Sequence, residues 1–383
     1  MAFNEAGGRG GEMRLGEKVW HLNLPFLVLI GLISCAGFAM LYSAANGSWE
    51  PWASRQAMRF AAGCVLLVAV ALTDIRFWYR WAYLIYFGVL ALLVAVEVKG
   101  SIGMGAQRWI DLQVIQLQPS ELMKVGLVVV LARYFHGLAE EDVIRPTRLV
   151  LPTLLAFAPA ALVLRQPDLG TAAMLLMVGG AIFFIVGVAW WKFALIIVAG
   201  LGAIPVAWNF LHEYQQQRVL TFLDPEADPL GAGYHTLQSK IALGSGGLFG
   251  KGFLGGTQSH LNFLPEKQTD FIFTMLAEEF GLVGGLFLIG LFALLFIYGF
   301  AIGLRARNHF ARILALGLTT NLFLYVFINI AMVMGLIPVV GVPLPLVSYG
   351  GTAQLAVMGA LGLIMSCYIH RDVRISRRGL GDD

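Results

Sequence analysis

The chain has 383 residues, of which 58% are hydrophobic and 13% are charged, and its mean hydropathy is +0.76. Soluble domains carry about 25% charged residues, so this composition excludes an ordinary soluble protein and indicates a polytopic membrane protein. The formal net charge of +3 is small and is explained by membrane topology, so no nucleic-acid partner is expected. No disulfide framework or metal-ligand spacing is formed by the three cysteines, Cys35, Cys64 and Cys367.

The apolar runs predict an all-α fold with about ten transmembrane helices, because about 20 apolar residues suffice to cross a bilayer. In chain order, the expected spans are Pro25–Ala45, Ala57–Thr73, Phe77–Val96, Ser120–Phe135, Leu149–Leu164, Thr171–Val188, Lys192–Leu211, Asp270–Leu304, Ala311–Met334 and Tyr349–His370. The fifth and sixth are short, and the eighth is long enough to include a portion in the interface.

Basic residues separate the two sides of the expected bundle. One side carries Arg14, Lys18, Arg76, Arg80, Arg145, Arg148, Lys192, Arg305, Arg307, Arg312, Arg371, Arg374, Arg377 and Arg378. The other side has few, such as Lys99, Arg108 and Arg165. The positive-inside rule therefore predicts that both termini are cytoplasmic and that the long loop is outside, in agreement with an even number of spans.

No soluble segment is large enough to form its own core, so a single domain is expected. We expect a cytoplasmic tail over residues 1–24, a transmembrane domain over 25–370 with an extracytoplasmic loop at about 212–269, and a second cytoplasmic tail over 371–383. The first apolar run is of full length and lacks a clear cleavage site, which favours a helix over a cleaved signal peptide.

Three expected extracytoplasmic segments interrupt the apolar runs. The first is 97–119, where GAQRWIDL is followed by QPSELMK, which continues to Lys124. The second is RQPDLGTA at 165–172, and the third is the long loop, which is rich in glycine from Gly231 to Gly256. The glycine-rich run lacks the strand-to-helix setting of phosphate-binding loops. It predicts close backbone packing and mobility over a substrate groove.

Asp270 stands where the long polar loop meets the apolar run that begins with Phe271. A carboxylate at the edge of a bilayer is costly unless it is paired or functional. It is either a general base whose proton affinity is raised by partial desolvation, or a helix N-terminal acid, with Thr269 or Asp270 as the cap. Position alone supports both interpretations equally.

Other polar residues fall inside the expected spans. Glu278 and Glu279 are expected two turns deeper than Asp270, and at least one of them is expected to pair within the bundle. Hydrogen bonding between helices explains a four-spaced polar stripe, Asn321, Tyr325 and Asn329.

Glu121 and Lys124 are three residues apart at the start of the fourth span, so they share a helix face. They form either a structural salt bridge or part of a site in which Lys124, Arg108 or Lys240 neutralises a phosphate-bearing headgroup. Arg108 also suits an interfacial anchor, because it adjoins a tryptophan. Asp168, in PDLG, suits a turn equally well.

Taken together, these motifs resemble the SEDS family, the shape, elongation, division and sporulation proteins, over nearly the whole chain. The blocks that carry the resemblance, in one order, are GAQRWIDL with QPSELMK, RQPDLGTA, DPLGAGYH, GKGFLGGTQSHLNFLPEKQTDFIF and VPLPLVSYGG. GTQSHLNFLPE before TDF is more similar to the elongation branch than to the division branch.

The resemblance implies a peptidoglycan glycosyltransferase of the bacterial cytoplasmic membrane that polymerises lipid II, the undecaprenyl-pyrophosphate-linked disaccharide-pentapeptide, at the outer face. The essential acid of the family matches Asp270, which is expected to be the general base. Many relatives have histidine two residues earlier, where this chain has Gln268, so that position is expected to tune the chemistry rather than carry it. Family motifs also match Arg108, Glu121, Lys124, Asp168 and Lys240.

The resemblance also implies a divalent cation and a partner. Mg²⁺ or Mn²⁺ prefers oxygen ligands, and Glu121 and Asp168 are the candidates. The departing pyrophosphate requires positive charge, for which Arg108, Lys124 and Lys240 are candidates. No residues for crosslinking are evident, so a class B penicillin-binding protein is the expected transpeptidase partner.

Two rival functions remain open from the sequence. A lipid II flippase predicts charges along a path through the midplane, whereas the candidates here cluster at the outer ends of spans. A scaffold that activates its partner predicts that loss of Asp270 leaves wall synthesis intact.

Overall fold

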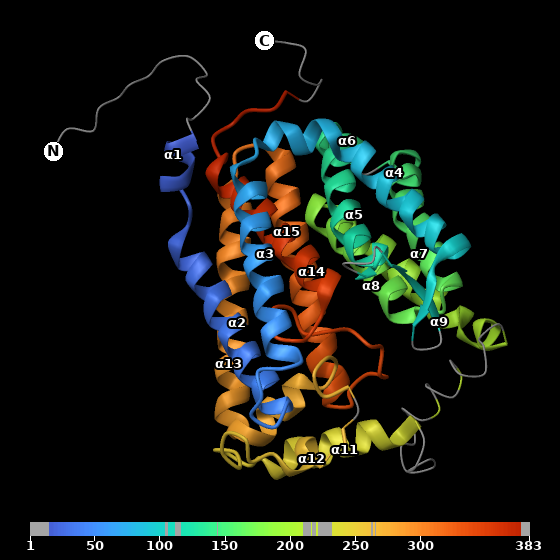
Figure 1. The fold of residues 1–383 in the computed structure, drawn as a ribbon. Coiled ribbons are helices and arrows are strands. Elements are labelled where there is room, and N and C mark those ends of the chain that lie inside the picture. The colour runs from blue at the N-terminus through green and yellow to red at the C-terminus, as the bar shows by residue number, and fades with distance from the viewer. Residues whose placement is uncertain are drawn as a thin grey trace.

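The computed structural model describes residues 15–103, 106–111, 116–143, 145–209, 216, 220, 232–261, 263–264 and 266–376. Within these ranges the chain forms a bundle of long helices with three short strands (Figure 1). The expected all-α membrane fold is therefore confirmed. Each expected span corresponds to one long helix, and the observed bounds are α2 Leu24–Ala44, α3 Trp52–Leu72, α4 Ile75–Lys99, α5 Pro119–His136, α7 Pro146–Arg165, α8 Leu169–Val186, α9 Trp190–Trp208, α13 Ile272–Arg305, α14 His309–Val333 and α15 Gly351–Ile369.

Eight of these helices are long and apolar enough to cross a membrane by length and composition alone: α2, α3, α4, α7, α8, α13, α14 and α15. The 18-residue α5 falls short because it contains Glu121, Lys124 and Arg133. For α9, the apolar stretch that qualifies covers only Trp190–Ala203. The described remainder contains the short helices α1 Leu15–Trp20, α6 Glu140–Val143, α11 Ala232–Ser245 and α12 Thr257–His260.

A small antiparallel sheet lies within the loop between α4 and α5. Its strands, in the order β1-β2-β3, are β1 Ser101–Gly103, β2 Ala106–Asp111 and β3 Gln116–Leu117. Ser101 is opposite Trp109, and Ile110 is opposite Leu117. The all-α prediction did not include these strands.

Side-chain caps fix where several of the long helices begin. The side-chain oxygens of Asn23, Asp74, Asp168 and Asn308 accept hydrogen bonds from the first-turn N–H groups of α2, α4, α8 and α14. Such caps satisfy N–H groups that have no partner within the helix.

α1 and the segment after α15 lie at the same end of the bundle. Lys18 donates to the Leu72 carbonyl at the end of α3, at 3.1 Å. The Arg307 N–H donates to the Arg371 carbonyl at 3.1 Å. α11 and α12 cross the opposite end (Figure 1), so these two helices and α1 lie at different ends of the bundle.

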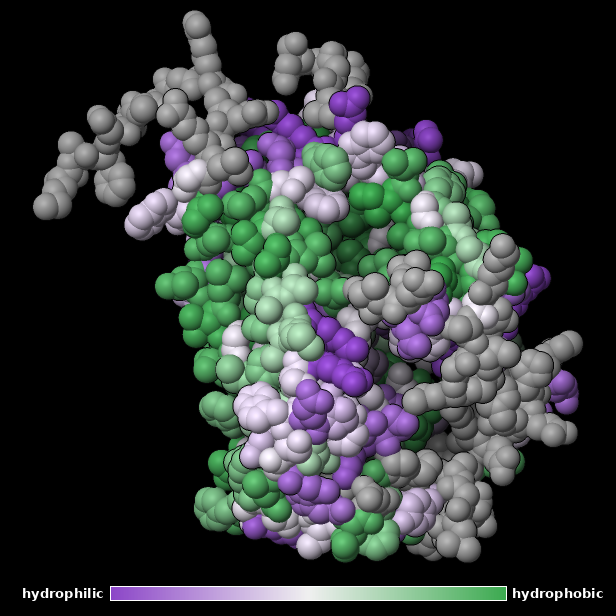
Figure 2. All heavy atoms as spheres, viewed as in Figure 1, coloured by the Kyte–Doolittle hydropathy of each residue, from purple (hydrophilic) through white to green (hydrophobic). Residues whose placement is uncertain are grey.

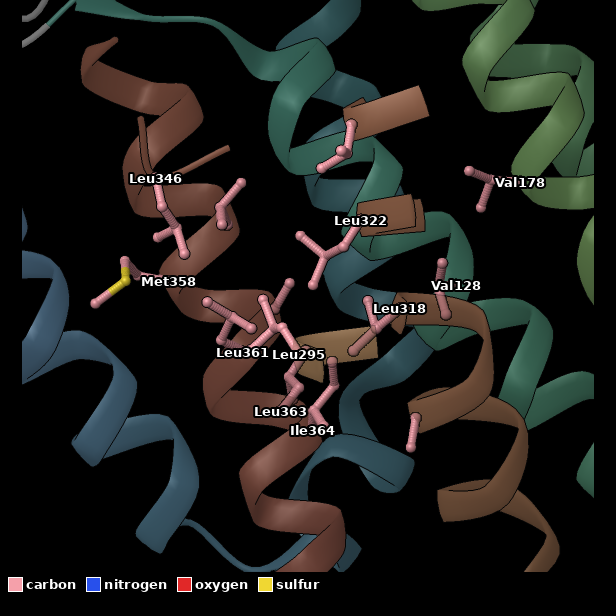
Figure 3. Close-up of a cluster of buried hydrophobic side chains, with 14 of the residues drawn as sticks. Val128, Val178, Leu295, Leu318, Leu322, Leu346, Met358, Leu361, Leu363 and Ile364 are labelled. Atoms are coloured by element: carbon pink, nitrogen blue, oxygen red, sulfur yellow. The ribbon is translucent and has the colours of Figure 1, made fainter. Parts of the chain in front are cut away.

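The core is built around α14 and α15. In the most apolar window of each helix, 72% of α14 and 78% of α15 is buried, against 22% for α3 and α4. Figure 3 shows Leu318 and Leu322 of α14 meeting Val128 of α5 and Leu361 and Ile364 of α15. The peripheral helices present apolar side chains outward, and Figure 2 shows such side chains over the upper half of the face in view.

α13 is broken near its start. Gly281 has φ 67° and ψ −164°, far from helical values, although the helix continues on both sides. The glycine-rich segment 246–252 bonds to both sides of this break. Before it, the Glu278 and Glu279 carbonyls accept from the Lys251 and Gly252 N–H groups at 3.1 and 3.0 Å.

After the break, the Leu282 and Val283 N–H groups donate to the Gly247 and Leu248 carbonyls at 2.9 and 3.1 Å. These four bonds bring the two backbones so close together that no side chain fits at Gly250. A Cβ at Gly250 would lie 2.1 Å from the Glu279 carbonyl oxygen. The predicted close packing of the glycine-rich run is thereby confirmed for this segment.

Replacement of Gly281 by alanine is expected to destabilise the protein. An added Cβ would meet the Gly250 nitrogen at 2.4 Å, and the positive φ adds strain of about 1–3 kcal/mol. Thermal unfolding of the purified protein in detergent measures the effect. Gly290→Ala, in the same helix with nothing within 4 Å of the added Cβ, is the control. Equal unfolding midpoints for the two variants would contradict this account.

Candidate functional site

Asp270 lies in the turn that precedes α13 and is half-buried. The N-cap position of α13 is Phe271, and no side chain caps it. The Thr269 hydroxyl instead donates to the Glu266 carbonyl at 3.2 Å. The interpretation of Thr269 or Asp270 as the helix cap is therefore wrong, because the helix starts later than that interpretation required.

The Asp270 carboxylate faces the loop that joins α14 to α15. A Cβ at Gly341 would lie 3.5 Å from Asp270 Oδ2, so the carboxylate lies against the backbone of that glycine. The Gln268 side chain donates to Glu266 at 3.2 Å. That contact directs Gln268 toward the preceding turn.

Glu121 and Lys124 form a buried ion pair in the first turns of α5. Lys124 Nζ lies 2.7 Å from Glu121 Oε1, and the two side chains are 1% and 4% exposed. The other oxygen, Glu121 Oε2, accepts a hydrogen bond from the Tyr325 hydroxyl of α14. Lys124 Nζ also lies 4.2 Å from the centre of the Tyr325 ring. The pair therefore cross-links α5 to α14, as expected of a structural salt bridge.

α14 places this pair close to Asp270. Asn329, one turn after Tyr325, donates through Nδ2 to the Asp270 carbonyl at 3.0 Å and to the Val342 carbonyl at 2.7 Å. Residues four apart on a helix share a face and are separated by about 6 Å along its axis. The expected interhelical hydrogen bonding of the polar stripe is confirmed for Tyr325, which bonds to Glu121 of α5, whereas Asn329 bonds to the turn before α13 and to the loop after α14.

Arg108 and Asp168 meet on the same side of the bundle. Arg108 Nη1 lies 3.6 Å from Asp168 Oδ2, and Arg108 donates to the Gln166 and Pro167 carbonyls at 3.1 and 2.6 Å. Asp168 caps α8, where its carboxylate accepts from the Thr171 N–H at 3.1 Å. The turn interpretation of Asp168 is correct, and Arg108 fixes that turn while its side chain stays 30% exposed.

Lys240 is separate from this network. It lies on α11, is exposed, and covers Gly335 at the start of the loop between α14 and α15. A Cβ at Gly335 would lie 2.2 Å from Lys240 Cε. The structure thus places Lys240 at one end of the loop that Asp270 faces.

Glu278 and Glu279 contact the segment between α11 and the turn before α13. Glu278 pairs with Lys251 at 2.7 Å, and Glu279 lies 3.4 Å from His260 and accepts from Ser43 at the end of α2. The expectation that they lie two turns deeper than Asp270 stays a prediction. The expected pairing within the bundle is confirmed for Glu279.

The donor set at Glu121 and Asp168 does not fit a resident metal ion. Both oxygens of Glu121 are engaged, by Lys124 and Tyr325, and Asp168 is engaged by Thr171 and Arg108. Across the described ranges, no cluster of three or more His, Cys, Asp or Glu side chains could hold a metal.

Sequence reasoning missed Lys267, three residues before Asp270. It is buried, at 6% exposure, and burial lowers the pKa of its ammonium group. The position of this lysine within PEKQTDF, the motif that ends next to Asp270, could have indicated it as a site residue. The same reasoning missed Ser348, which lies within the VSYGG block.

The fold and site together define a polytopic membrane protein with an acidic and basic site at one end of the bundle. The chain matches the family model described as cell cycle protein, for FtsW, RodA and SpoVE, over residues 19–373. This protein belongs to that family, and the resemblance to the SEDS proteins is confirmed.

Named relatives agree over most of the chain. The peptidoglycan glycosyltransferase MrdB of Escherichia coli K12 is 46% identical over 356 residues, which cover 93% of this chain and 95% of MrdB. The solved rod shape determining protein RodA of Thermus thermophilus is 30% identical with a TM-score of 0.70, covering 92% of this chain and 98% of RodA. A chain from a peptidoglycan synthase complex, solved to explain how polymerization and crosslinking are coordinated, is 32% identical with a TM-score of 0.80, covering 91% and 98%.

Lys124→Met is expected to destabilise the protein by about 3–5 kcal/mol, because it leaves the Glu121 carboxylate buried without its cation. Adding Glu121→Gln should recover part of this loss. Thermal unfolding in detergent measures both effects. The control is Arg145→Met, which removes an exposed pair with Asp142 at 3.0 Å that is worth less than about 1 kcal/mol. Equal midpoints for Lys124→Met and Arg145→Met would contradict the structural role of the pair.

Proposed function

We propose that this protein polymerises lipid II into glycan strands at the outer face of the bacterial cytoplasmic membrane, as a peptidoglycan glycosyltransferase of cell elongation. Family membership and the 46% identity to a peptidoglycan glycosyltransferase support the activity. The observation that supports the site is the position of Asp270, half-buried in a turn with its carboxylate beside Gly341 of the loop between α14 and α15. Figure 2 shows polar side chains extending into a hollow on the lower half of the molecule.

Asp270 is the general base of the proposed reaction. It takes the proton from the 4-hydroxyl of the acceptor GlcNAc as that oxygen bonds to the anomeric carbon of the lipid-linked MurNAc. The bond from that carbon to the pyrophosphate breaks, and undecaprenyl pyrophosphate leaves with the electron pair. Attack in line on an α-linked donor gives a β-linked glycan. Proton transfer of this kind contributes about 10²–10⁴-fold to the rate.

Positive charge near Asp270 is proposed to neutralise the leaving pyrophosphate. Arg108 and Lys240 are accessible, and Arg108 is already oriented by the turn before α8. Lys124 is buried against Glu121, so it contributes through the field of the ion pair instead of direct contact. Lipid II would keep its tail in the bilayer while its sugars meet Asp270.

The protein is proposed to have both termini in the cytoplasm and to work with a class B penicillin-binding protein that supplies the transpeptidase. The basic residues at the end with α1 support this orientation. The likeness to a chain of a peptidoglycan synthase complex supports the partner. The flippase alternative loses support, because Glu278 and Glu279 pair with extracytoplasmic segments and do not line a path inward.

Asp270→Asn is expected to lower glycan formation from purified lipid II by about 100-fold or more, because the base is lost. Each variant is purified with the transpeptidase partner and tested for folding by thermal unfolding. Glu97→Gln, which removes an outer-face acid paired with Arg165, is the control and should retain activity. Equal product from Asp270→Asn and wild type would place the base elsewhere. Lipid II transfer across liposomes without polymerisation would favour the flippase.

Involvement of Mg²⁺ or Mn²⁺ stays a prediction. Removal of divalent cations with a chelator is expected to lower glycan formation, and either ion should restore it. The unfolding midpoint should stay unchanged, because Glu121 and Asp168 have protein partners and do not require a resident metal. A chelator-induced fall in the midpoint would show a resident metal and contradict this expectation.

A further inference from the structure

Three consecutive backbone carbonyls that end at Asp270 accept hydrogen bonds from three different groups. The Gln268 carbonyl accepts from the Tyr349 N–H at 2.8 Å, and the Thr269 carbonyl accepts from the Ser348 hydroxyl at 2.6 Å. The Asp270 carbonyl accepts from Asn329 Nδ2 at 3.0 Å. The donors come from α14 and from the segment before α15, both distant from Asp270 in the sequence.

The Ser348 hydroxyl is itself oriented. It is buried, at 4% exposure, and its oxygen accepts from the Leu344 N–H at 2.7 Å. A hydroxyl has one hydrogen to donate, and with its oxygen engaged by Leu344 that hydrogen points to the Thr269 carbonyl. Ser348 therefore cannot turn away without losing two buried bonds.

A further contact holds the segment that carries these donors. Gln56 of α3 is fully buried, and its Nε2 donates to the Ser348 carbonyl at 3.0 Å. Its Oε1 accepts from the Gly350 N–H at 3.4 Å. The turn that contains Asp270 is therefore held by α14 and by the segment before α15. That segment is in turn held by α3.

We propose that Ser348 and Asn329 are positioning residues for Asp270. By holding the backbone on which Asp270 stands, they fix the location of its carboxylate beside Gly341 without touching the substrate. This proposal rests on the proposed role of Asp270 as the base. A displacement of about 1 Å at a reacting group costs on the order of 10²-fold in rate, so backbone bonds of this kind matter to catalysis even at a distance from the reacting atoms.

Ser348→Ala and Asn329→Ala test the proposal independently, because the two residues act from different parts of the chain. For each, kcat for polymerisation from lipid II, with the transpeptidase partner present, is expected to fall by about 10–100-fold. KM for lipid II should change less than about twofold, since neither side chain contacts the substrate. Ser348→Thr keeps the hydroxyl and should recover most of the rate.

Matched controls lie at the other end of the same two elements. Ser366→Ala removes a buried hydroxyl of α15 that donates to the Thr73 carbonyl at 2.9 Å. Asn308→Ala removes a buried amide that donates to the Val373 carbonyl at 3.1 Å. Unfolding midpoints should fall similarly in each test variant and its control, whereas kcat should fall only in the test variants. The proposal would be overturned if kcat were the same for Ser348→Ala and Ser366→Ala and also the same for Asn329→Ala and Asn308→Ala.

A second measurement separates this proposal from the base assignment. In a chain whose native cysteines are replaced by alanine, Asp270→Cys is labelled with a charged, water-soluble maleimide. Adding Ser348→Ala should change the labelling rate by more than about twofold, and adding Ser366→Ala should not. If Ser348→Ala alters the labelling rate but Asp270→Asn is active, Ser348 positions residue 270 and Asp270 is not the base. If Ser348→Ala leaves the rate unaltered and Asp270→Asn is inactive, Asp270 is the base and Ser348 does not position it.

Discussion

Backbone polar groups in the hydrocarbon region must find their hydrogen bonds within the protein, because lipid offers none. This constraint governs the end of the bundle that carries α11 and α12. α13 leaves helical geometry at Gly281, and the segment 246–252 supplies the carbonyls and N–H groups that the break requires. Because the backbone groups at the break have hydrogen-bond partners, the residues before Gly281 can run in a different direction from the rest of α13. That direction places Asp270 against the loop between α14 and α15 and places Glu279 beside the end of α2.

α14 connects the two charged groups of the site. Through Tyr325 it holds the carboxylate of a buried ion pair, and through Asn329 it holds the backbone of Asp270. The ion pair is costly to bury, which makes it a weak source of stability but a strong constraint on how α5 and α14 fit together. The site is therefore built from the most buried helices of the bundle, and its acid is held by the core although it lies near the surface.

Hydropathy predicted every long helix, because a bilayer demands long apolar runs. The start of α3 was placed five residues late, at Ala57 instead of Trp52, since Arg55, Gln56 and Arg59 lower the hydropathy of its first turns. Those polar residues belong to the helix because the segment before α15 gives Gln56 and Arg59 partners.

For the site, the sequence indicated Asp270, and the three-residue spacing of Glu121 and Lys124 on one helix indicated that the two side chains can pair. The contacts of Ser348 and Asn329 join distant parts of the chain, so local pattern could not show them. Nor did the sequence distinguish Gly281 from the other glycines of α13, because only the approach of the segment 246–252 makes it the site of the break.

A break in a helix commonly acts as a hinge, but the one at Gly281 is bonded on both of its sides to a single short segment. The two parts of α13 are thus held at a fixed angle. The short part of α13 and the turn that carries Asp270 are therefore connected to the long part of the helix both through the chain and through the segment 246–252.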